Sequence, residues 1–183
     1  MNLPILVLAI AFYAGVCWAT LRHFRRVHAI PGALAALSIV WAGAFLAQII
    51  ALWPSRDLPP TAAIALPLLL IAITLWGWTV KSSRGAGLSL AFSLDLPTRL
   101  LECGPYRFVR HPFYTSYLLN WLALSLATLQ WWVVAPSAAA VAIVVFAARS
   151  EEAKFANSDL ADRYAAYQAR TGMFFPRLRS TTA

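Results

Sequence analysis

Charged side chains are scarce in this chain of 183 residues. They make up 12% of the sequence against 61% hydrophobic residues, whereas about 25% of an ordinary soluble domain is charged. This scarcity excludes an ordinary soluble globular domain. Acidic residues are the rarer sign, with 7 Asp and Glu against 15 Lys and Arg. Because the basic residues flank long apolar runs, we expect an integral membrane protein in contact with membrane lipids, with no nucleic-acid partner.

Cysteine is also rare. Cys17 and Cys103 are the only two cysteines, and they stand far apart in the chain. This spacing indicates neither a disulfide framework nor a metal site. The N-terminus has no basic segment ahead of the first apolar run, and that run ends in arginines instead of small residues. We therefore expect the first apolar run to be retained and not cleaved as a signal peptide.

Long apolar runs dominate the rest of the sequence. Crossing about 30 Å of hydrocarbon takes roughly 20 helical residues. The stretch from Phe113 to Ala148 has no charged residue and is too long for one span, and it carries break signals at Gln130 and Pro136. It therefore predicts a helical hairpin that turns near Gln130. The five predicted spans are Leu3–Leu21, Ala33–Trp53, Ala62–Val80, Phe113–Leu129 and Val133–Ala148.

The positions of the basic residues predict an orientation. In a five-span arrangement, 14 of the 15 Lys and Arg residues fall on one side of the membrane, and Arg56 alone falls on the other. A four-span arrangement would destroy this asymmetry. Positively charged loops stay in the cytosol, so we expect the N-terminus outside and the C-terminus cytosolic. A short chain of this kind suits a bacterial inner membrane.

The two halves of the chain differ in polar content. Residues 1–80 are predicted to be a three-helix transmembrane scaffold, because their apolar runs contain no charged residue. Residues 81–183 are predicted to form the functional half, with the long loop Lys81–Pro112, the hairpin and a C-terminal helix. That helix is amphipathic, and a cap at Asn157-Ser158-Asp159 is expected to interrupt and restart it. The predicted fold is all-α.

Two polar clusters are expected to meet at the cytosolic membrane surface. One runs from Gly104 to Tyr114 before the fourth span, and the other is Arg149-Ser150-Glu151-Glu152 after the fifth. The hairpin brings its two ends side by side. Simple anchoring at the membrane surface would explain the basic and aromatic residues, but it would not explain a carboxylate pair, which is costly there unless it is matched.

These clusters carry a resemblance to a known family. The run Gly104-Pro105-Tyr106 followed by Arg110-His111-Pro112-Phe113-Tyr114, and the later Glu151-Glu152 with Tyr164-x-x-Tyr167, resemble the isoprenylcysteine carboxyl methyltransferases. The related phospholipid N-methyltransferases share parts of both signatures. The resemblance covers Leu100 to Pro176. It implies a membrane enzyme that uses S-adenosyl-L-methionine as its cofactor.

The resemblance also implies roles for individual residues. Glu151 would bind the sulfonium cofactor by its charge, and tyrosine faces attract the same cation. Arg110 or Arg149 would orient an anionic acceptor by a bidentate contact. The implied catalytic residues are Arg110, Arg149 and Glu152, and the implied cofactor-binding residues are Leu100, Leu101, Tyr106, His111, Pro112, Phe113, Tyr114 and Glu151.

The sequence departs from the family pattern in three places. Ser116 stands where the family usually has glycine, and Ala147 stands where the family has its substrate-orienting arginine. The usual Phe-Gly pair before the two tyrosines is absent, with Asp159-Leu160 near that place. These differences bear on the acceptor more than on the cofactor.

The sequence therefore predicts an S-adenosylmethionine-dependent methyltransferase of the carboxyl O-methyltransferase type. Its partner would be a lipophilic small molecule or lipidated acceptor, with an isoprenylcysteine-like carboxylate as one option. Two alternatives stay open. One is a nicotinamide-dependent membrane reductase of the sterol-reductase type, and the other is a non-enzymatic membrane subunit.

Overall fold

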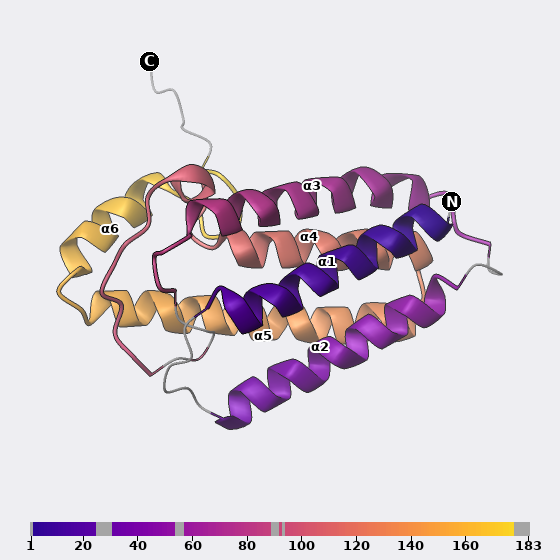
Figure 1. The fold of residues 1–183 in the computed structure, drawn as a ribbon, viewed down its shortest axis with the longest axis horizontal. Coiled ribbons are helices and arrows are strands. Elements are labelled where there is room, and N and C mark those ends of the chain that lie inside the picture. The colour runs from indigo at the N-terminus through magenta and orange to yellow at the C-terminus, as the bar shows by residue number, and fades with distance from the viewer. Residues whose placement is uncertain (1, 25–30, 54–56, 89–91, 93, 178–183) are drawn as a thin grey trace, which may run out of the picture.

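The protein is a bundle of helices (Figure 1). The structure is a computed structural model, and it describes residues 2–24, 31–53, 57–88, 92 and 94–177. Within these residues there is no β-strand, and one isolated parallel bridge joins Val109 to Gly172. The helices are α1 (Asn2–Arg22), α2 (Pro31–Ala51), α3 (Ala62–Ser82), the 3₁₀ helix η1 (Gly104–Arg107), α4 (Pro112–Thr128), α5 (Trp131–Ala156) and α6 (Ala161–Arg170).

The prediction of an all-α chain is confirmed, and each predicted apolar span is a helix. The hairpin between α4 and α5 turns at Leu129, whose φ of 49° is left-handed, and at Gln130. Pro136 does not contribute to this break, because it lies inside α5. It stands close to the start of that helix, where proline removes one intrahelical hydrogen bond without ending the helix.

Three of the helices, α1, α3 and α5, are long and apolar enough to cross a membrane by length and composition. The described apolar part of α2, Ala35–Ala51, and the 17 residues of α4 are shorter. These helices support an integral membrane protein, while the five spans stay a prediction. Beyond Ala148 the polar end of α5 carries its two glutamates past the apolar part of the helix.

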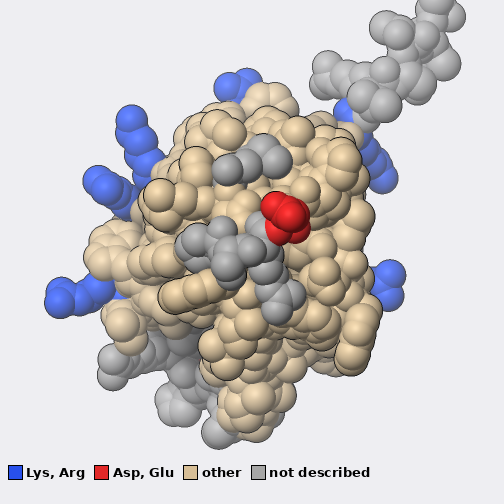
Figure 2. All heavy atoms as spheres, turned by 90° about the vertical axis from the view of Figure 1, so that its right-hand side faces the viewer, with Lys and Arg blue, Asp and Glu red and all other residues tan. Residues whose placement is uncertain are grey.

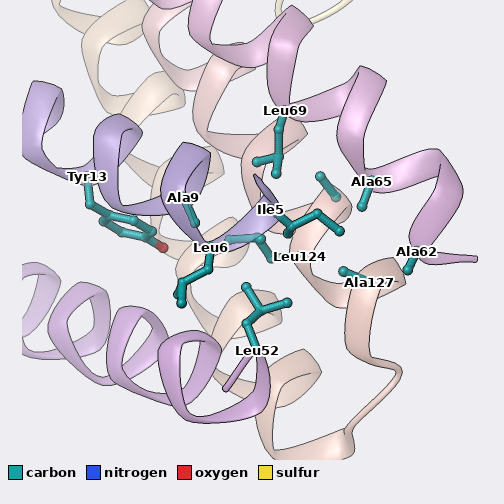
Figure 3. Packing of buried hydrophobic residues seen from close by; sticks show 11 residues of the cluster. Ile5, Leu6, Ala9, Tyr13, Leu52, Ala62, Ala65, Leu69, Leu124 and Ala127 are labelled. Atoms are coloured by element: carbon teal, nitrogen blue, oxygen red, sulfur yellow. The ribbon is translucent and has the colours of Figure 1, made fainter. Parts of the chain in front are cut away.

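The packing of the helices differs from their order in the chain. α3 lies along α4, α1 packs chiefly on α3, and α2 packs chiefly on α5. At one end of the bundle α1 and the end of α2 still meet, because Ile5 and Leu6 of α1 share a core cluster with Leu52, the residue that follows α2 (Figure 3). A second cluster around Phe12, Val16 and Trp121 lies further along α1. The first cluster closes the end of the bundle opposite α6.

Polar side chains link four helices inside this core. The hydroxyl of Tyr13 donates to Oε1 of Gln48 at 2.8 Å, and Nε1 of Trp121 donates to the Tyr13 oxygen at 3.2 Å. Nε2 of Gln48 in turn donates to Oγ of Ser137 at 3.3 Å. Hydrogen bonds of this kind hold helices together where no water is present.

The C-terminal helix forms as predicted and folds back on α5. Phe155, in the last turn of α5, stacks on Tyr164 of α6 with ring centroids 4.3 Å apart. The interruption falls between Asn157 and Leu160, although no side chain caps α6. Instead, Oγ of Ser158 accepts a hydrogen bond from the backbone N–H of Leu160 at 3.2 Å.

Candidate functional site

A cavity of about 590 Å³ lies at the α6 end of the bundle. Its volume falls in the range of roughly 300–1,000 Å³ that is usual for small-molecule sites. Every α-helix except α3 contributes to its lining, together with η1 and the segment before η1. The lining residues of the polar end are Arg99, Leu100, Leu101, Tyr106, Arg110, His111, Pro112, Phe113, Tyr114, Glu151, Phe155, Tyr164 and Tyr167.

The first wall of this polar end is the segment from Gly104 to Tyr114. Glycine and proline residues restrict its backbone conformation. Gly104 has a φ of 56°, and a Cβ atom there would collide with the side chain of Ser82, so only glycine fits this turn. Pro105 then starts the 3₁₀ turn that holds Tyr106. Pro112 opens α4, and a residue before proline is kept out of the helical region. His111 therefore stands just outside the helix, with its ring at the cavity wall.

The second wall comes from α5, whose helical geometry separates the two adjacent glutamates. Neighbouring residues differ by about 100° around a helix, so Glu151 and Glu152 point in different directions. Glu151 lines the cavity on the same face as Val144 and Phe155. Its carboxylate accepts a hydrogen bond from the hydroxyl of Tyr114, and its Oε2 lies 3.6 Å from Nδ1 of His111.

Glu152 turns away from the cavity and forms a polar network behind it. Its Oε1 atom lies 2.7 Å from Nε of Arg110 and 3.2 Å from Nε2 of His111, and its Oε2 accepts a hydrogen bond from Gln168 at 3.0 Å. Arg110 also donates to the carbonyl oxygen of Thr171 at 2.5 Å. The imidazole of His111 is thus held between the two carboxylates.

The environment shifts the pKa values of these carboxyl groups in opposite directions. Both lie past the apolar part of α5. Burial raises the pKa of Glu151, and the charge of His111 and the hydrogen bond from Tyr114 oppose that effect only in part. Burial also raises the pKa of Glu152, but the hydrogen bonds and charges of His111 and Arg110 lower it by more, from 4.5 to about 2. Glu152 is therefore an anion at neutral pH. Burial raises the pKa of Tyr106, so its phenol stays neutral.

The segment after α6 closes the site from outside. Backbone N–H groups of Arg110 and His111 donate to the carbonyl oxygens of Gly172 and Met173 at 2.8 and 3.1 Å. The hydroxyl of Tyr167 donates to the carbonyl oxygen of Tyr106 at 2.6 Å. These bonds fix the Arg-His-Pro segment against the end of α6, over a long separation in the chain.

A charged cluster ties the loop before η1 to α6. Oε1 of Glu102 lies 2.7 Å from Arg163, and its Oε2 contacts Arg170. Both arginines are more than half exposed, so each pair contributes little to stability. Glu102 directly follows Leu100 and Leu101, so these pairs join the end of that loop to α6.

The predicted site residues fall into two groups in this arrangement. All of the predicted cofactor-binding residues line the cavity, as does Arg110. Arg149 and Glu152 are absent from the lining. Arg149 is exposed, because it lies about 200° around α5 from Glu151. Their catalytic roles stay predictions.

Two of the departures from the family pattern have a clear structural setting. Ser116 is fully buried and its hydroxyl donates to the carbonyl oxygen of Phe113 at 2.6 Å, within its own helix. Ala147 is also buried. It lies on the same face of α5 as Val144 and Glu151, because residues three, four and seven apart share a helix face. A methyl group therefore stands where an arginine would approach the cavity.

Sequence reasoning missed the part of the cavity that α1 and α2 build. Residues 1–80 were predicted to be scaffold, yet two of their helices supply the apolar end of the lining. Aliphatic residues in an apolar helix give no signal of such a role, and only Trp41 stands out by its size. The missed residues are Val16, Cys17, Thr20, Leu21, Phe24, Leu37, Ser38 and Trp41, with Tyr117 and Val144 from the hairpin.

A search of the curated proteins finds no match to the chain. A scan against protein families matches residues 60–163 to phospholipid methyltransferase. The matched region begins just before α3 and ends within α6, so it contains η1, the hairpin and both glutamates, and it spans more than half of the chain. The chain therefore belongs to the phospholipid methyltransferase family, which is related to the isoprenylcysteine carboxyl methyltransferases that its motifs resemble.

Proposed function

We propose that this membrane methyltransferase uses S-adenosyl-L-methionine and transfers the methyl group to a lipophilic acceptor. The observation that carries the proposal is the position of Glu151. Its carboxylate lies at the wall of a largely apolar cavity, beside Tyr114 and His111. A carboxylate and tyrosine rings together suit a ligand that carries a positive charge. Family membership supports the same chemistry.

The lining residues would each hold a different part of the cofactor. When bound, S-adenosylmethionine supplies a methyl group on a positively charged sulfur. Glu151 would attract that charge, and Tyr106 and Tyr114 would offer their ring faces. His111 and the backbone of Leu100 and Leu101 would hold the polar ends of the ligand. In such a site catalysis rests on alignment and on exclusion of water more than on proton transfer.

The acceptor is less closely defined than the cofactor. Arg110 already donates to Glu152 and to Thr171, so it would orient an anionic acceptor only by leaving these partners. We propose instead that Arg110 and Glu152 position His111. An isoprenylcysteine-like carboxylate stays an option for the acceptor. It would then need Arg99, which lines the cavity and makes no ion pair with any described residue.

The distribution of charge supports the proposed orientation in the membrane, which for this chain would be a bacterial inner membrane. Figure 2 views the end of the bundle that holds the hairpin turn, and its described surface is almost uncharged apart from one acidic patch. Basic side chains project only around its rim. Helices α1, α3 and α5 all end at the opposite face, where Arg22, Lys81 and Lys154 stand in their last turns. We infer that this face is cytosolic.

The direct test is a thermal-shift and calorimetric titration of the purified protein with S-adenosylhomocysteine. A ligand that binds only the folded state raises its stability. We expect a saturable shift that Glu151→Gln and His111→Ala abolish and that the surface variant Asp162→Asn retains. Retention of binding in both site variants would refute the assigned pocket. A shift with a nicotinamide cofactor in place of S-adenosylhomocysteine would favour the reductase alternative.

A further inference from the structure

The cavity extends well beyond the polar end that the cofactor would need. Its remaining lining is mostly apolar and comes largely from α1 and α2, with Val16 on one side and Leu37 and Trp41 on the other. None of these three residues lies in the region that matches the family. The apolar end is therefore built largely by residues that lie outside the matched region.

The way the helices pack explains why this space exists. α1 and α2 follow each other in the chain, but α1 packs chiefly on α3 and α2 packs chiefly on α5. They meet at the closed end of the bundle, where Leu6 of α1 lies beside Leu52, the residue that follows α2 (Figure 3). Towards the α6 end both helices line the cavity, with Val16 and Cys17 from α1 and Leu37 from α2. We use the name α1–α2 slot for the part of the cavity lined by Val16, Cys17, Leu21, Leu37 and Trp41.

Trp41, at the end of the slot, lies at about the depth of one leaflet of a bilayer. Trp41 lies ten residues beyond Pro31, the first residue of α2, which is about 15 Å at 1.5 Å per residue. This is about half of the roughly 30 Å hydrocarbon thickness. Leu21 is 64% exposed and Cys17 is also exposed, so the side of the slot faces the surrounding lipid.

The floor of the slot is a packed aromatic cluster. The Trp41 ring lies 4.7 Å from Tyr117 and 5.1 Å from Trp121 in edge-to-face contacts, and 6.0 Å from Tyr13. Behind Trp41, Tyr13 and Phe45 fill the space between α1 and α2, with ring centroids 4.3 Å apart. A chain that enters the slot from the polar end therefore meets the indole ring and ends there.

We propose that the α1–α2 slot binds the aliphatic chain of the methyl acceptor and that Trp41 sets the longest chain that fits. The inference rests on the proposed function, because the slot is continuous with the cavity that would hold the methyl donor. Its occupant is a single hydrocarbon chain reaching to the middle of the bilayer. Leu37 and Val16 form the walls, and Trp41 is the specificity-determining residue.

Cys17 provides a reporter for this proposal. It lines the slot and is exposed, and Cys103 is the only other thiol. In a Cys103→Ser protein in lipid nanodiscs, the extent of reaction of Cys17 with N-ethylmaleimide is measured by intact mass. The probes are saturated lysophosphatidylethanolamines of increasing chain length. We expect protection of Cys17 to rise with chain length up to an optimum and then to fall.

Substitutions distinguish binding of a chain in the slot from a general effect of lipid on the reactivity of Cys17. Leu37→Trp fills the slot and is expected to remove protection by every chain. Trp41→Ala deepens the slot and is expected to move the optimum to longer chains. Leu46→Trp is the matched control, because Leu46 is also on α2 but is 59% exposed away from the cavity. It is expected to behave like the parent.

The outcomes distinguish this inference from the proposed function. S-adenosylhomocysteine binding is measured by calorimetry in each protein. If the parent binds S-adenosylhomocysteine but Cys17 reacts equally with and without every chain, the slot proposal is overturned and the methyltransferase proposal stands. Equal behaviour of Leu37→Trp and Leu46→Trp, or an unchanged optimum in Trp41→Ala, would overturn it as well. Absence of S-adenosylhomocysteine binding in the parent protein would instead refute the proposed function.

Discussion

Nε of Arg110 donates a hydrogen bond of 2.7 Å to Oε1 of Glu152, and both side chains are only 11% exposed. The pair lies behind the cavity and also holds His111 through the same carboxylate oxygen. This contact, together with those of His111 and Tyr114 to the same two glutamates, joins two segments far apart in the chain. The pair therefore aligns the wall that carries His111 with the wall that carries Glu151.

Glu152→Gln is expected to weaken S-adenosylhomocysteine binding without removing any lining side chain. The amide is neutral, so Arg110 and His111 lose their charged partner, and a hydrogen bond to a charged group is worth about 1.5–3 kcal/mol. We expect Glu152→Asp to recover part of the affinity, because it restores the charge. Equal calorimetric affinity of Glu152→Gln and the wild type would exclude a positioning role.

The lowered pKa of Glu152 predicts how the stability of the protein depends on pH. This pKa falls from 4.5 to about 2 on folding. A lowered folded-state pKa stabilises the protein at pH values above the unfolded pKa, and that contribution is lost as the pH falls through the folded value. Thermal stability in detergent should therefore decrease between about pH 4.5 and pH 2. In Glu152→Gln this part of the decrease should be absent, and an unchanged profile would contradict the prediction.

Gly172→Ala is expected to disrupt the closure of the site. A Cβ atom at Gly172 would collide with the carbonyl oxygen of Phe175, so the segment after α6 must shift. Forcing extra atoms into a packed position typically costs about 1–3 kcal/mol. Gly43→Ala is the control, because nothing lies within 4 Å of its Cβ position and alanine favours a helix. Thermal unfolding should separate the two variants, and similar melting temperatures would refute this account.

Tyr13→Phe tests the polar contacts in the core of the bundle. The substitution removes the hydroxyl that donates to Gln48 and accepts from Trp121. Such hydrogen bonds between membrane helices contribute about 0.6 kcal/mol each and up to about 1.7, so we expect a loss near 1 kcal/mol. A double-mutant cycle with Gln48→Leu measures the coupling directly. A coupling energy of zero would show that the contact contributes nothing to stability.

The sequence predicted the helices and the polar end of the cavity well, for clear physical reasons. The apolar runs place the helices, and the hairpin forces the Arg-His-Pro segment beside Glu151 whatever the details of packing. The lining role of Tyr106 and Tyr114 followed from the family motif. The different roles of the adjacent Glu151 and Glu152 needed the helix itself, because α5 continues past Ala148 and turns them to separate partners.

The parts that escaped prediction depend on packing between distant segments. Nothing in the composition of α1 or α2 indicates that Val16 and Leu37 line a cavity. An apolar side chain is equally compatible with contact to lipid, to a protein core or to a ligand. The bridge between Val109 and Gly172 also left little trace in the sequence. Only the small size of Gly172 marks a close approach, and glycine after a helix is common for other reasons.

The contact between Arg110 and the segment after α6 has a consequence for how the protein is made. The backbone groups of Arg110 and His111 are satisfied by Gly172 and Met173, which are synthesised long after them. Because chains fold from the N-terminus as they emerge, all six described α-helices precede the segment that completes this wall of the cavity. During synthesis the helices that line the cavity would therefore be complete before the wall that carries His111 is fixed, and that wall would be completed only when the segment after α6 has docked.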